Sequence, residues 1–199
     1  MSVTFQESET LQNLMRAFAG ESQAQSRYVF AAELARQQKL PVAEAVFLFT
    51  AQQECAHAKV FYQHLSALSG ETIPAEGSWP VDLGNDLLLL LRAAQHNEFQ
   101  EWQDVYPAFA DAAQQEGFPQ AEQSFRQIAL IEKSHGQRFG RLADLLEEGK
   151  LFLSDAACGW MCLNCGHILN AAEAPKQCPV CHHEQGYFIR LELAPWTDR

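Results

Sequence analysis

Two Glu-x-x-His pairs limit the folds open to this 199-residue chain more than any other feature of its sequence. The pairs are Glu54 with His57 and Glu132 with His135. Residues three positions apart lie on one face of a helix, so each pair would project a carboxylate and an imidazole in the same direction. A single such pair is common among surface residues, whereas two pairs in long helical stretches call for an explanation.

Two further glutamates precede these pairs at nearly equal distances. Glu21 lies 33 positions before Glu54, and Glu98 lies 34 positions before Glu132. A third glutamate, Glu101, follows Glu98 at the i, i+3 spacing. Each half of this region therefore has a Glu followed by a Glu-x-x-His, which we interpret as a pseudo-twofold repeat of a helix pair.

Glycines and prolines are sparse in the first three quarters of the chain and leave room for four long helices. A loop at 70–84 separates the second helix from the third, and Pro107 should kink or break the third. Apolar residues recur at helical spacing, for example Phe61 and Leu65 in the second helix and Phe125 and Ile128 in the fourth. We therefore predict an all-α four-helix bundle with helices at 9–38, 41–69, 85–116 and 119–148.

The acids and histidines interrupt the apolar faces of these helices at matched levels. One Glu from each of two helices and a Glu-x-x-His from each of the other two is the established ligand set of di-iron and di-manganese bundles, so the assignment matches a known pattern and is not an independent derivation. Carboxylates can bridge two cations, and a neutral imidazole suits iron. Without metals, burying these carboxylates would cost several kcal/mol per ion. The alternative, a set of ordinary surface acids, leaves their register unexplained.

The last part of the chain carries four cysteines in two C-x-x-C pairs, Cys162 with Cys165 and Cys178 with Cys181. Each pair is typical of a tight turn whose backbone N–H groups can reach the sulfurs. Four thiolates make a tetrahedral site for iron or zinc, and a unit this short would need a metal to fold. We predict a bundle domain at 1–149 and a metal-binding domain at 150–199.

The remaining cysteines and histidines are not expected to bind these metals. We expect Cys158 to be a free thiol and Cys55 to be a core residue. His64 lies two helical turns beyond the nearest predicted ligand, and His96 should point away from the ligands. Surface positions are expected for His182 and His183.

Charge and hydropathy exclude several classes of protein. The formal net charge of −11 makes nucleic acid an unfavourable partner. The longest aliphatic run, Leu87 to Leu91, is far too short to span a bilayer. The N-terminus lacks the basic and apolar segments of a secretory signal, and paired cysteines suit metal binding in a reducing compartment. We therefore expect a soluble, cytoplasmic protein.

Several stretches of the chain resemble rubrerythrin. Residues Phe18–Tyr28 are similar to the start of its first helix, and Glu98–Ala110 are similar to its third. Trp160 and the Cys178–Cys181 turn are similar to rubredoxin, although His167 stands where that pattern usually has an aromatic residue. The resemblance covers nearly the whole chain. It implies a ferritin-like bundle with a small C-terminal rubredoxin-like domain.

The resemblance also implies a role for each ligand of the bundle. Two iron ions would be bridged by Glu54 and Glu132, and His135 would bind one of them. Glu101 and His57 would compete for the other iron as its oxidation state changes. The terminal ligands would be Glu21 and Glu98, while Tyr28 and Tyr106 could hydrogen-bond to ligands.

Rubrerythrins reduce hydrogen peroxide, so the resemblance implies a non-haem di-iron peroxidase acting in oxidative-stress defence. Glu101, His57, Tyr28 and Tyr106 would be its catalytic residues. Electrons would come from an external donor, such as a reductase or a rubredoxin, through an iron at the four-cysteine site. The resemblance further implies a homodimer, and a tetramer is also compatible with this function.

Two other functions stay open at this point. The first is ferritin-like iron oxidation and storage, which requires a closed shell of many subunits and has no use for an electron-carrying tail. The second places zinc at the four-cysteine site and makes the tail a knuckle that recruits a partner protein. A visible spectrum separates iron from zinc, because a ferric tetrathiolate is red and a zinc site is colourless.

Overall fold

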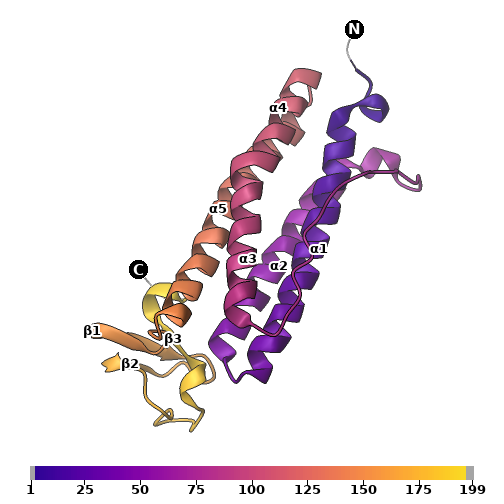
Figure 1. Cartoon of the computed structure of the whole chain (residues 1–199). Helices are drawn as coiled ribbons and strands as arrows, with labels where there is room; N and C mark the ends of the chain where they lie inside the picture. The colour runs from indigo at the N-terminus through magenta and orange to yellow at the C-terminus, as the bar shows by residue number, and fades with distance from the viewer. Residues whose placement is uncertain (1–2, 196–199) are drawn as a thin grey trace.

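The computed structural model describes residues 3–195 of the chain. Long helices form an elongated bundle, and a small sheet lies at one end of it (Figure 1). Two antiparallel helices, α1 and α2, make one half of the bundle, and α3, α4 and α5 make the other. The helices are α1 (Glu9–Gln37), α2 (Pro41–His64), α3 (Leu87–Gln100), α4 (Tyr106–Glu116) and α5 (Pro119–Glu147).

Local signals in the sequence set the ends of these helices. The Ser8 side chain accepts a hydrogen bond from the Leu11 N–H at 3.0 Å and caps α1, and Asp86 caps α3 in the same way. Pro41 and Pro119 occupy the first turns of α2 and α5, where a missing N–H costs nothing. These signals explain why the predicted helix limits agree closely with the structure. A short 3-10 turn, Ser66–Leu68, follows α2 and extends it toward its predicted end.

The third predicted helix contains a π-helical segment, Glu101–Val105, between α3 and α4. The Tyr106 N–H bonds to the Glu101 carbonyl, five residues back, instead of the usual four. A proline in a regular helix would press its ring against the carbonyl four residues earlier. Here Pro107 falls in the first turn of α4, directly after the wider segment. The expected disruption therefore takes the form of a π-helical segment, and the three pieces stay in line (Figure 1).

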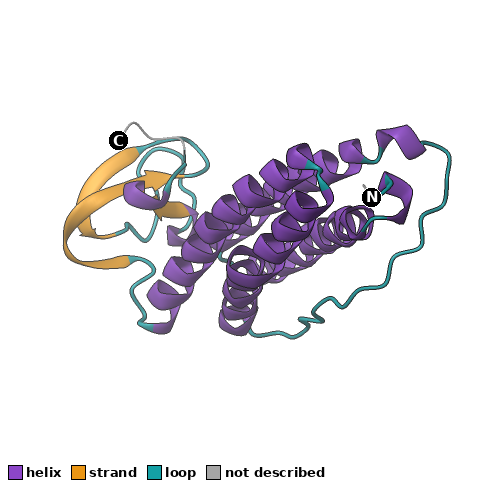
Figure 2. Ribbon diagram, turned by 90° about the horizontal axis from the view of Figure 1, so that it is seen from above, coloured by secondary structure: helices purple, strands orange, loops and turns teal. Residues whose placement is uncertain are grey.

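The segment from Ser69 to Asp86 contains no helix or strand and connects opposite ends of the bundle. It runs along the outside of the helices from the end of α2 to the start of α3 (Figure 2). We call it the crossover segment. Because it returns the chain to the first end, α2 and α3 run in the same direction. A bundle with one such long crossover has the ferritin-like connectivity, which confirms the predicted fold class.

Two apolar clusters fill the bundle, one toward each end. Phe47, Leu91 and Phe139 belong to the cluster nearer the sheet, and Phe61 and Phe125 belong to the other. All five side chains are fully buried. The acids and histidines singled out in the sequence lie between these two clusters. The core thus encloses a polar layer on both sides.

The C-terminal part forms a three-stranded antiparallel sheet in the order β2-β1-β3. Trp160 on β1 is completely buried in the small core of this sheet, and its Nε1–H donates to the Ala171 carbonyl at 3.0 Å. Ile189 on β3 packs into the bundle cluster that contains Phe47, and Gly186 lies against the Lys39 carbonyl. The sheet is therefore seated on the turn between α1 and α2. Its strands are β1 (Leu153–Cys162), β2 (Ile168–Glu173) and β3 (Phe188–Arg190).

Among residues 3–195, no helix is both long enough and apolar enough to cross a membrane.

Candidate metal centres

The polar layer of the bundle is built from all of its long helices. Six of the seven predicted ligands have no more than 7 % of their surface exposed, and the seventh, Glu101, is half-buried. Carboxylates buried to this degree are rare unless they are paired or bind a cation. The buried residues are Glu21 on α1, Glu54 and His57 on α2, Glu98 on α3, and Glu132 and His135 on α5.

His57 faces three carboxylates from three different helices. Its Nδ1 lies 2.9 Å from Glu132 Oε1, 3.2 Å from Glu54 Oε2 and 3.7 Å from Glu21 Oε2. His57 and Glu54 stand three residues apart on one helix, as the sequence pattern requires. The other two carboxylates come from helices on either side. One imidazole nitrogen and three carboxylate oxygens therefore converge on one small volume.

His135 repeats this arrangement in the other half of the bundle. Its Nδ1 lies 2.8 Å from Glu132 Oε2, 2.9 Å from Glu54 Oε1 and 3.5 Å from Glu98 Oε2. Glu54 and Glu132 each direct one oxygen to His57 and the other to His135. The two imidazole rings are nearly parallel, with centroids 5.5 Å apart. Cations beside the two imidazoles would each lie in reach of both Glu54 and Glu132.

Many polar atoms in this layer have no hydrogen-bond partner. They include oxygens of Glu21, Glu54, Glu98 and Glu132 and both ring nitrogens of His135. Unsatisfied buried polar groups cost free energy, and several at one place indicate that an ion is bound there. Carboxylate oxygens with imidazole nitrogens are a donor set that suits iron and manganese. The residues therefore fit a two-metal site, and the di-iron-type centre predicted from the sequence is present.

Without a cation, burial changes the protonation of the carboxylates. Burial raises the pKa of Glu21 to about 8, although the nearby His57 imidazole opposes the change. Burial also raises the pKa of Glu132 well above its usual value, and the charges of Glu21 and Glu54 add to this effect. At Glu54 burial again favours the neutral acid, but the two nearby histidines outweigh it and lower the pKa to about 2. Glu54 thus differs from Glu21 and Glu132, because its surroundings favour the ionised form.

The two imidazoles are affected in the opposite sense. Burial disfavours their charged form, but the nearby carboxylates of Glu21 and Glu54 raise the pKa of His57 to about 10. The carboxylates of Glu132 and Glu54, at 2.8 and 2.9 Å from Nδ1, likewise overcome burial and raise the pKa of His135 to about 11. In the absence of metal, two imidazolium ions thus supply positive charge at the places where two metal ions would sit. Metal binding must displace those protons.

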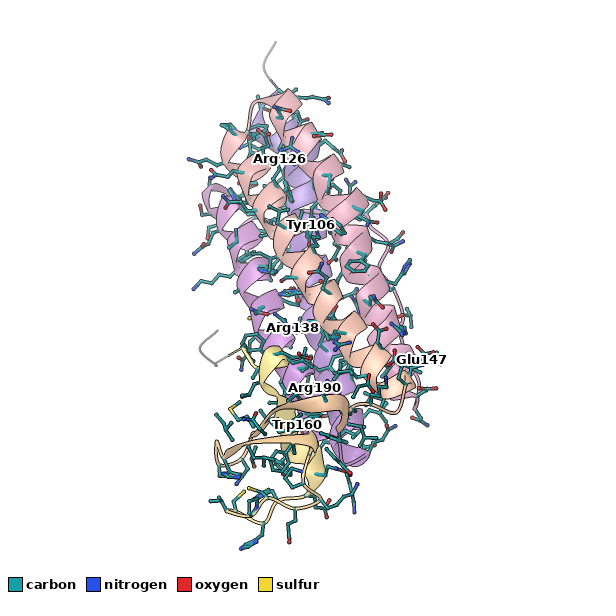
Figure 3. The ribbon with its side chains drawn as sticks, turned by 90° about the vertical axis from the view of Figure 1, so that its left-hand side faces the viewer. Tyr106, Arg126, Arg138, Glu147, Trp160 and Arg190 are labelled. Atoms are coloured by element: carbon teal, nitrogen blue, oxygen red, sulfur yellow. The ribbon has the colours of Figure 1, made fainter. Side chains whose placement is uncertain are left out.

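Two buried tyrosines hold the outer carboxylates from opposite sides. The Tyr28 hydroxyl donates a hydrogen bond to Glu98 Oε1, and the Tyr106 hydroxyl donates one to Glu21 Oε1. Both side chains are at most 3 % exposed. Tyr28 belongs to the apolar cluster near the sheet, and Tyr106 belongs to the cluster at the other end. Tyr106 lies within the helical bundle (Figure 3). The structure therefore brings both predicted tyrosines to the ligand layer.

Glu101 is placed differently from the other predicted ligands. It lies on the π-helical segment, and its carboxylate comes within 4.8 Å of atoms from Glu98 and Glu132. Burial, followed by the charges of Glu21 and Glu98, raises its pKa well above the usual value. Among residues 3–195, no hydrogen bond holds its side chain. Glu101 thus stands at the edge of the layer, in reach of it but not fixed.

The four predicted cysteines meet in the small C-terminal part, and Cys181 lines a pocket together with Pro41 and Glu44 of α2. Cys162 Sγ lies 3.7 Å from Cys181 Sγ, and Cys165 Sγ lies 3.7 Å from Cys178 Sγ. The sulfurs all lie within 4.8 Å of one another. This spacing suits a single tetrahedral metal ion. The four-cysteine site predicted from the sequence is therefore present.

The two cysteine turns have the same backbone design. The Gly166 N–H donates to the Cys162 carbonyl at 2.8 Å, and the His182 N–H donates to the Cys178 carbonyl at 3.0 Å. Gly166 and His182 both adopt positive φ, at 75° and 61°. Backbone N–H groups reach the sulfurs, as predicted, and the N–H of His183 lowers the pKa of the Cys181 thiol to about 5. A thiolate at neutral pH is the form that binds metal.

Some expectations about neighbouring residues are confirmed and two need correction. Cys158 is in no disulfide, and His64 bonds to Ser124 away from the metal layer. Cys55 is exposed, so the prediction of a core cysteine was wrong. It points away from Glu54 as expected, but that direction leads to solvent. His183 is half-buried and packs edge-on against the Tyr187 ring, so it is not a free surface residue.

Comparison with known proteins agrees with this geometry. The profile of the rubrerythrin family matches residues 12–143, and that of the rubredoxin-like domain of rubrerythrin matches residues 160–189. The chain belongs to the rubrerythrin family. The rubrerythrin of Clostridium perfringens is 44 % identical over 90 % of this chain and 93 % of its own length. That of Porphyromonas gingivalis is 41 % identical over 94 % and 92 %.

Solved structures show the same architecture. The fully reduced, all-ferrous state of nigerythrin is 29 % identical and covers 96 % of this chain and 88 % of its own, with a TM-score of 0.62. Symerythrin from Cyanophora paradoxa, at 22 % identity and a TM-score of 0.59, supports the fold alone. Rubrerythrins form a group of oxidoreductases, and the rubredoxin-like part suggests electron transfer.

One part of the site in this rubrerythrin-family chain was missed from the sequence. A cavity of about 180 Å³ adjoins the metal layer at Glu101 and Tyr106. Its outer wall includes Trp79 and Pro80 of the crossover segment, which the sequence marked only as a loop. Arg27 lines it from α1. The lone tryptophan among the turn residues of 70–84 was the one available signal.

Proposed function

We propose that this chain is a non-haem di-iron peroxidase that reduces hydrogen peroxide to water in oxidative-stress defence. The observation that carries this proposal is the position of Glu101. A two-metal bundle site needs four carboxylates and two imidazoles, and Glu101 is a fifth carboxylate. It stands between the buried layer and the cavity, with no hydrogen bond to hold it. A ligand that can move at the mouth of a metal site suits a site that changes oxidation state.

Peroxide reduction breaks one O–O bond and consumes two electrons and two protons to give two water molecules. A di-iron centre held by Glu54, Glu132, His57, His135 and the outer carboxylates would supply the two electrons. Iron is the proposed metal because the nigerythrin structure with the same architecture is in an all-ferrous state. We propose that Glu101 and His57 exchange as ligands of one iron. Tyr28 and Tyr106 would keep Glu98 and Glu21 oriented during this exchange.

The four-cysteine site would deliver the electrons, received from an external donor such as a reductase or a rubredoxin. A cytoplasmic location belongs to this proposal, because reducing conditions keep the cysteines as thiolates. The sheet packs on the turn before Pro41, and 13 helical residues, about 20 Å, separate Pro41 from Glu54. Figure 3 shows Trp160 of the sheet and Tyr106 of the bundle at well-separated levels. We therefore propose a homodimer or tetramer in which electrons cross between subunits.

The test is anaerobic mixing of the iron-loaded, reduced protein with hydrogen peroxide. We expect one peroxide consumed for each pair of bundle irons oxidised. The double variant Glu101→Ala/His57→Ala should lose the reaction, and Asp104→Ala, an exposed acid in the same π-helical segment, should keep it. Activity that survives in the double variant would sink the exchange mechanism. No peroxide consumption by the wild type would sink the function itself.

Two simple measurements address the competing functions. Sedimentation that shows a closed shell of many subunits would favour iron storage, whereas a dimer or tetramer excludes a cage. A red protein with ferric tetrathiolate absorption supports electron transfer through the tail. A colourless protein with zinc in the four-cysteine site would instead favour a partner-binding knuckle.

A further inference from the structure

The cavity beside Glu101 is the starting point. It lies between α1, the π-helical segment and the crossover segment, and both Glu101 and Tyr106 line it. The crossover segment passes outside the helices, so it forms the outer wall of this cavity (Figure 2). A molecule that enters here reaches a predicted ligand directly. The residues of the crossover segment that line it are Gly77, Ser78, Trp79 and Pro80.

Two glycines, which lack a Cβ atom, leave the space that the Trp79 indole occupies. A methyl group on Gly77 would come within 2.6 Å of the indole ring, and one on Gly20 would come within 3.3 Å of the indole Nε1. A Cβ atom essentially never lies within 3.0 Å of another heavy atom, so any side chain at position 77 would force the ring to shift. Gly20 directly precedes the predicted ligand Glu21. The same point above Gly20 is 4.0 Å from Glu101 Oε1, so the indole and this carboxylate face one small space.

Polar contacts tie the crossover segment to the bundle on both sides of Trp79. Before it, Arg16 Nε on α1 donates to the Glu76 carbonyl at 2.8 Å. After it, Asn97 Nδ2 on α3 donates to Asp82 Oδ2 at 2.8 Å, and Arg27 Nε lies 3.8 Å from the same oxygen. Because the crossover segment is held at Glu76 and at Asp82, Trp79 between them has a defined position. The half-buried indole is therefore held at the cavity and does not merely lie on the surface.

We propose that Trp79 determines the size of the oxidant that reaches the di-iron site, admitting hydrogen peroxide and excluding bulky organic hydroperoxides. The inference rests on the proposed peroxidase function. The cavity wall contains arginine guanidinium groups, the Glu101 carboxylate and the Trp79 indole, and these polar groups suit a small polar molecule. A large apolar group would have to displace a rigid bicyclic ring whose segment is held by the contacts of Arg16, Asn97 and Arg27. Trp79 is thus a specificity-determining residue for the reaction and takes no part in its chemistry.

The first test compares two substrates in the iron-loaded, full-length protein. Trp79→Ala should raise kcat/KM for cumene hydroperoxide relative to hydrogen peroxide by at least about tenfold, the scale on which pockets discriminate by size. Trp79→Phe should give an intermediate ratio, and it keeps the test open if the alanine variant fails to fold. Val81→Ala is the matched control, because Val81 is 83 % exposed on the same segment and does not line the cavity. A ratio that is the same in all four proteins would overturn the proposal.

The second test does not depend on peroxidase activity. Azide and 4-nitrophenolate both bind ferric iron with a change in the visible spectrum, and they differ greatly in size. Azide should bind the oxidised wild type and Trp79→Ala alike, whereas 4-nitrophenolate should bind only the variant. Equal binding of 4-nitrophenolate to the wild type and the variant would refute the size limit. If the size limit holds here while the wild type consumes no peroxide, the role of Trp79 stands and the peroxidase proposal falls.

Discussion

The Tyr106 hydroxyl donates a hydrogen bond to Glu21, a carboxylate from the opposite half of the bundle. Tyr28 makes the converse contact with Glu98. Tyr28 follows Glu21 by seven positions, whereas Tyr106 follows Glu98 by eight. The π-helical segment between Glu98 and Tyr106 accounts for the extra residue, because its hydrogen bonds span five residues and not four. The two tyrosines therefore obey the same pseudo-twofold relation as the ligands.

The positions of two prolines locate this extra residue. Pro41 precedes Glu54 by 13 positions, and Pro119 precedes Glu132 by the same number. The second helices of the two pairs are thus in register, so the additional residue lies between Glu98 and Pro119, and the tyrosine spacing places it before Tyr106. One inserted residue explains both the unequal tyrosine spacing and the difference between 33 and 34 positions.

Replacing Tyr106 with phenylalanine should weaken metal binding at the bundle. The change leaves Glu21 Oε1 buried without its donor, and loss of a partner that orients a ligand typically costs about 10–100-fold in metal affinity. Tyr28→Phe should do the same through Glu98. Titration of the metal-free protein with ferrous iron would measure this. Tyr62→Phe is the control, because Tyr62 is 58 % exposed and its ring stacking on Phe18 is kept. Unchanged affinity in Tyr106→Phe would show that the contact does not orient Glu21.

Sequence spacing was enough to predict the layer of carboxylates and imidazoles, because each of its six buried residues sits on a regular helix. Glu54 and His57 share a face whatever surrounds them, and the repeat places Glu132 and His135 opposite. The helix ends were equally predictable from local signals such as Ser8 and Pro119. These features depend on residues that are close together in the chain, so the sequence alone is enough to predict them.

Other features depend on contacts between distant segments and could not be predicted in the same way. The position of Trp79 depends on Gly20, which is far from it in sequence, and it brings the indole near Glu101. The π-helical segment left two sequence signals, the spacing of 34 where the first repeat has 33 and the spacing of eight between Glu98 and Tyr106 where Glu21 and Tyr28 are seven apart. A loop of different length would give the first signal, and the second has meaning only once both tyrosines are seen at the buried layer. For Cys55, the sequence indicated the direction of the side chain but not whether another helix lies there.

Deleting Gln103 should convert the π-helical segment to a regular helix. Gln103 is exposed, and its removal makes the Glu98-to-Tyr106 spacing equal to that of Glu21 and Tyr28. We expect the protein to fold and to bind metals, but Glu101 should lose its place at the cavity. A displacement of about 1 Å can cost on the order of 100-fold in rate, so peroxide reduction should fall by about that factor. Gln103→Ala keeps the chain length and should behave as the wild type. Full activity in the deletion variant would mean that the segment does not position Glu101.

Replacing Cys165 with serine should remove the metal of the tail and leave the bundle metals in place. A tetrahedral site needs all four thiolates, and the small core around Trp160 has little else to hold it. Metal analysis should show one ion fewer per chain, and the sheet should become sensitive to proteolysis. Cys158→Ser is the matched control, since Cys158 lies on the same strand as Cys162 but outside the cluster. Loss of metal in Cys158→Ser as well would contradict the assignment of the four ligands.

The stability of the metal-free protein should fall as pH rises from about 5 to 9. The folded-state pKa values of Glu21, His57 and His135 are raised, to about 8, 10 and 11, from ordinary values of 4.5 and 6.5. Each group therefore binds more protons in the folded than in the unfolded chain, so its stabilising contribution is complete below the ordinary value and is lost as pH passes through the raised one. Glu54 acts in the opposite sense, but only between its ordinary value of 4.5 and about 2, below this range.

Metal binding should reverse that trend, because metal ions and protons compete for the same atoms. Thermal unfolding of the metal-free and iron-loaded forms at constant ionic strength should give midpoints that move apart as pH rises. An indicator dye should also detect proton release when ferrous iron is added at pH 7. Glu116→Gln is a useful control, because the pKa of Glu116 is lowered by hydrogen bonds from Thr10 and Glu9, far from the metals. In that variant the unfolding midpoints of the metal-free and iron-loaded forms should still move apart as pH rises. Curves that stay parallel from pH 5 to 9 would mean that His57 and His135 do not carry the protons that the metals displace.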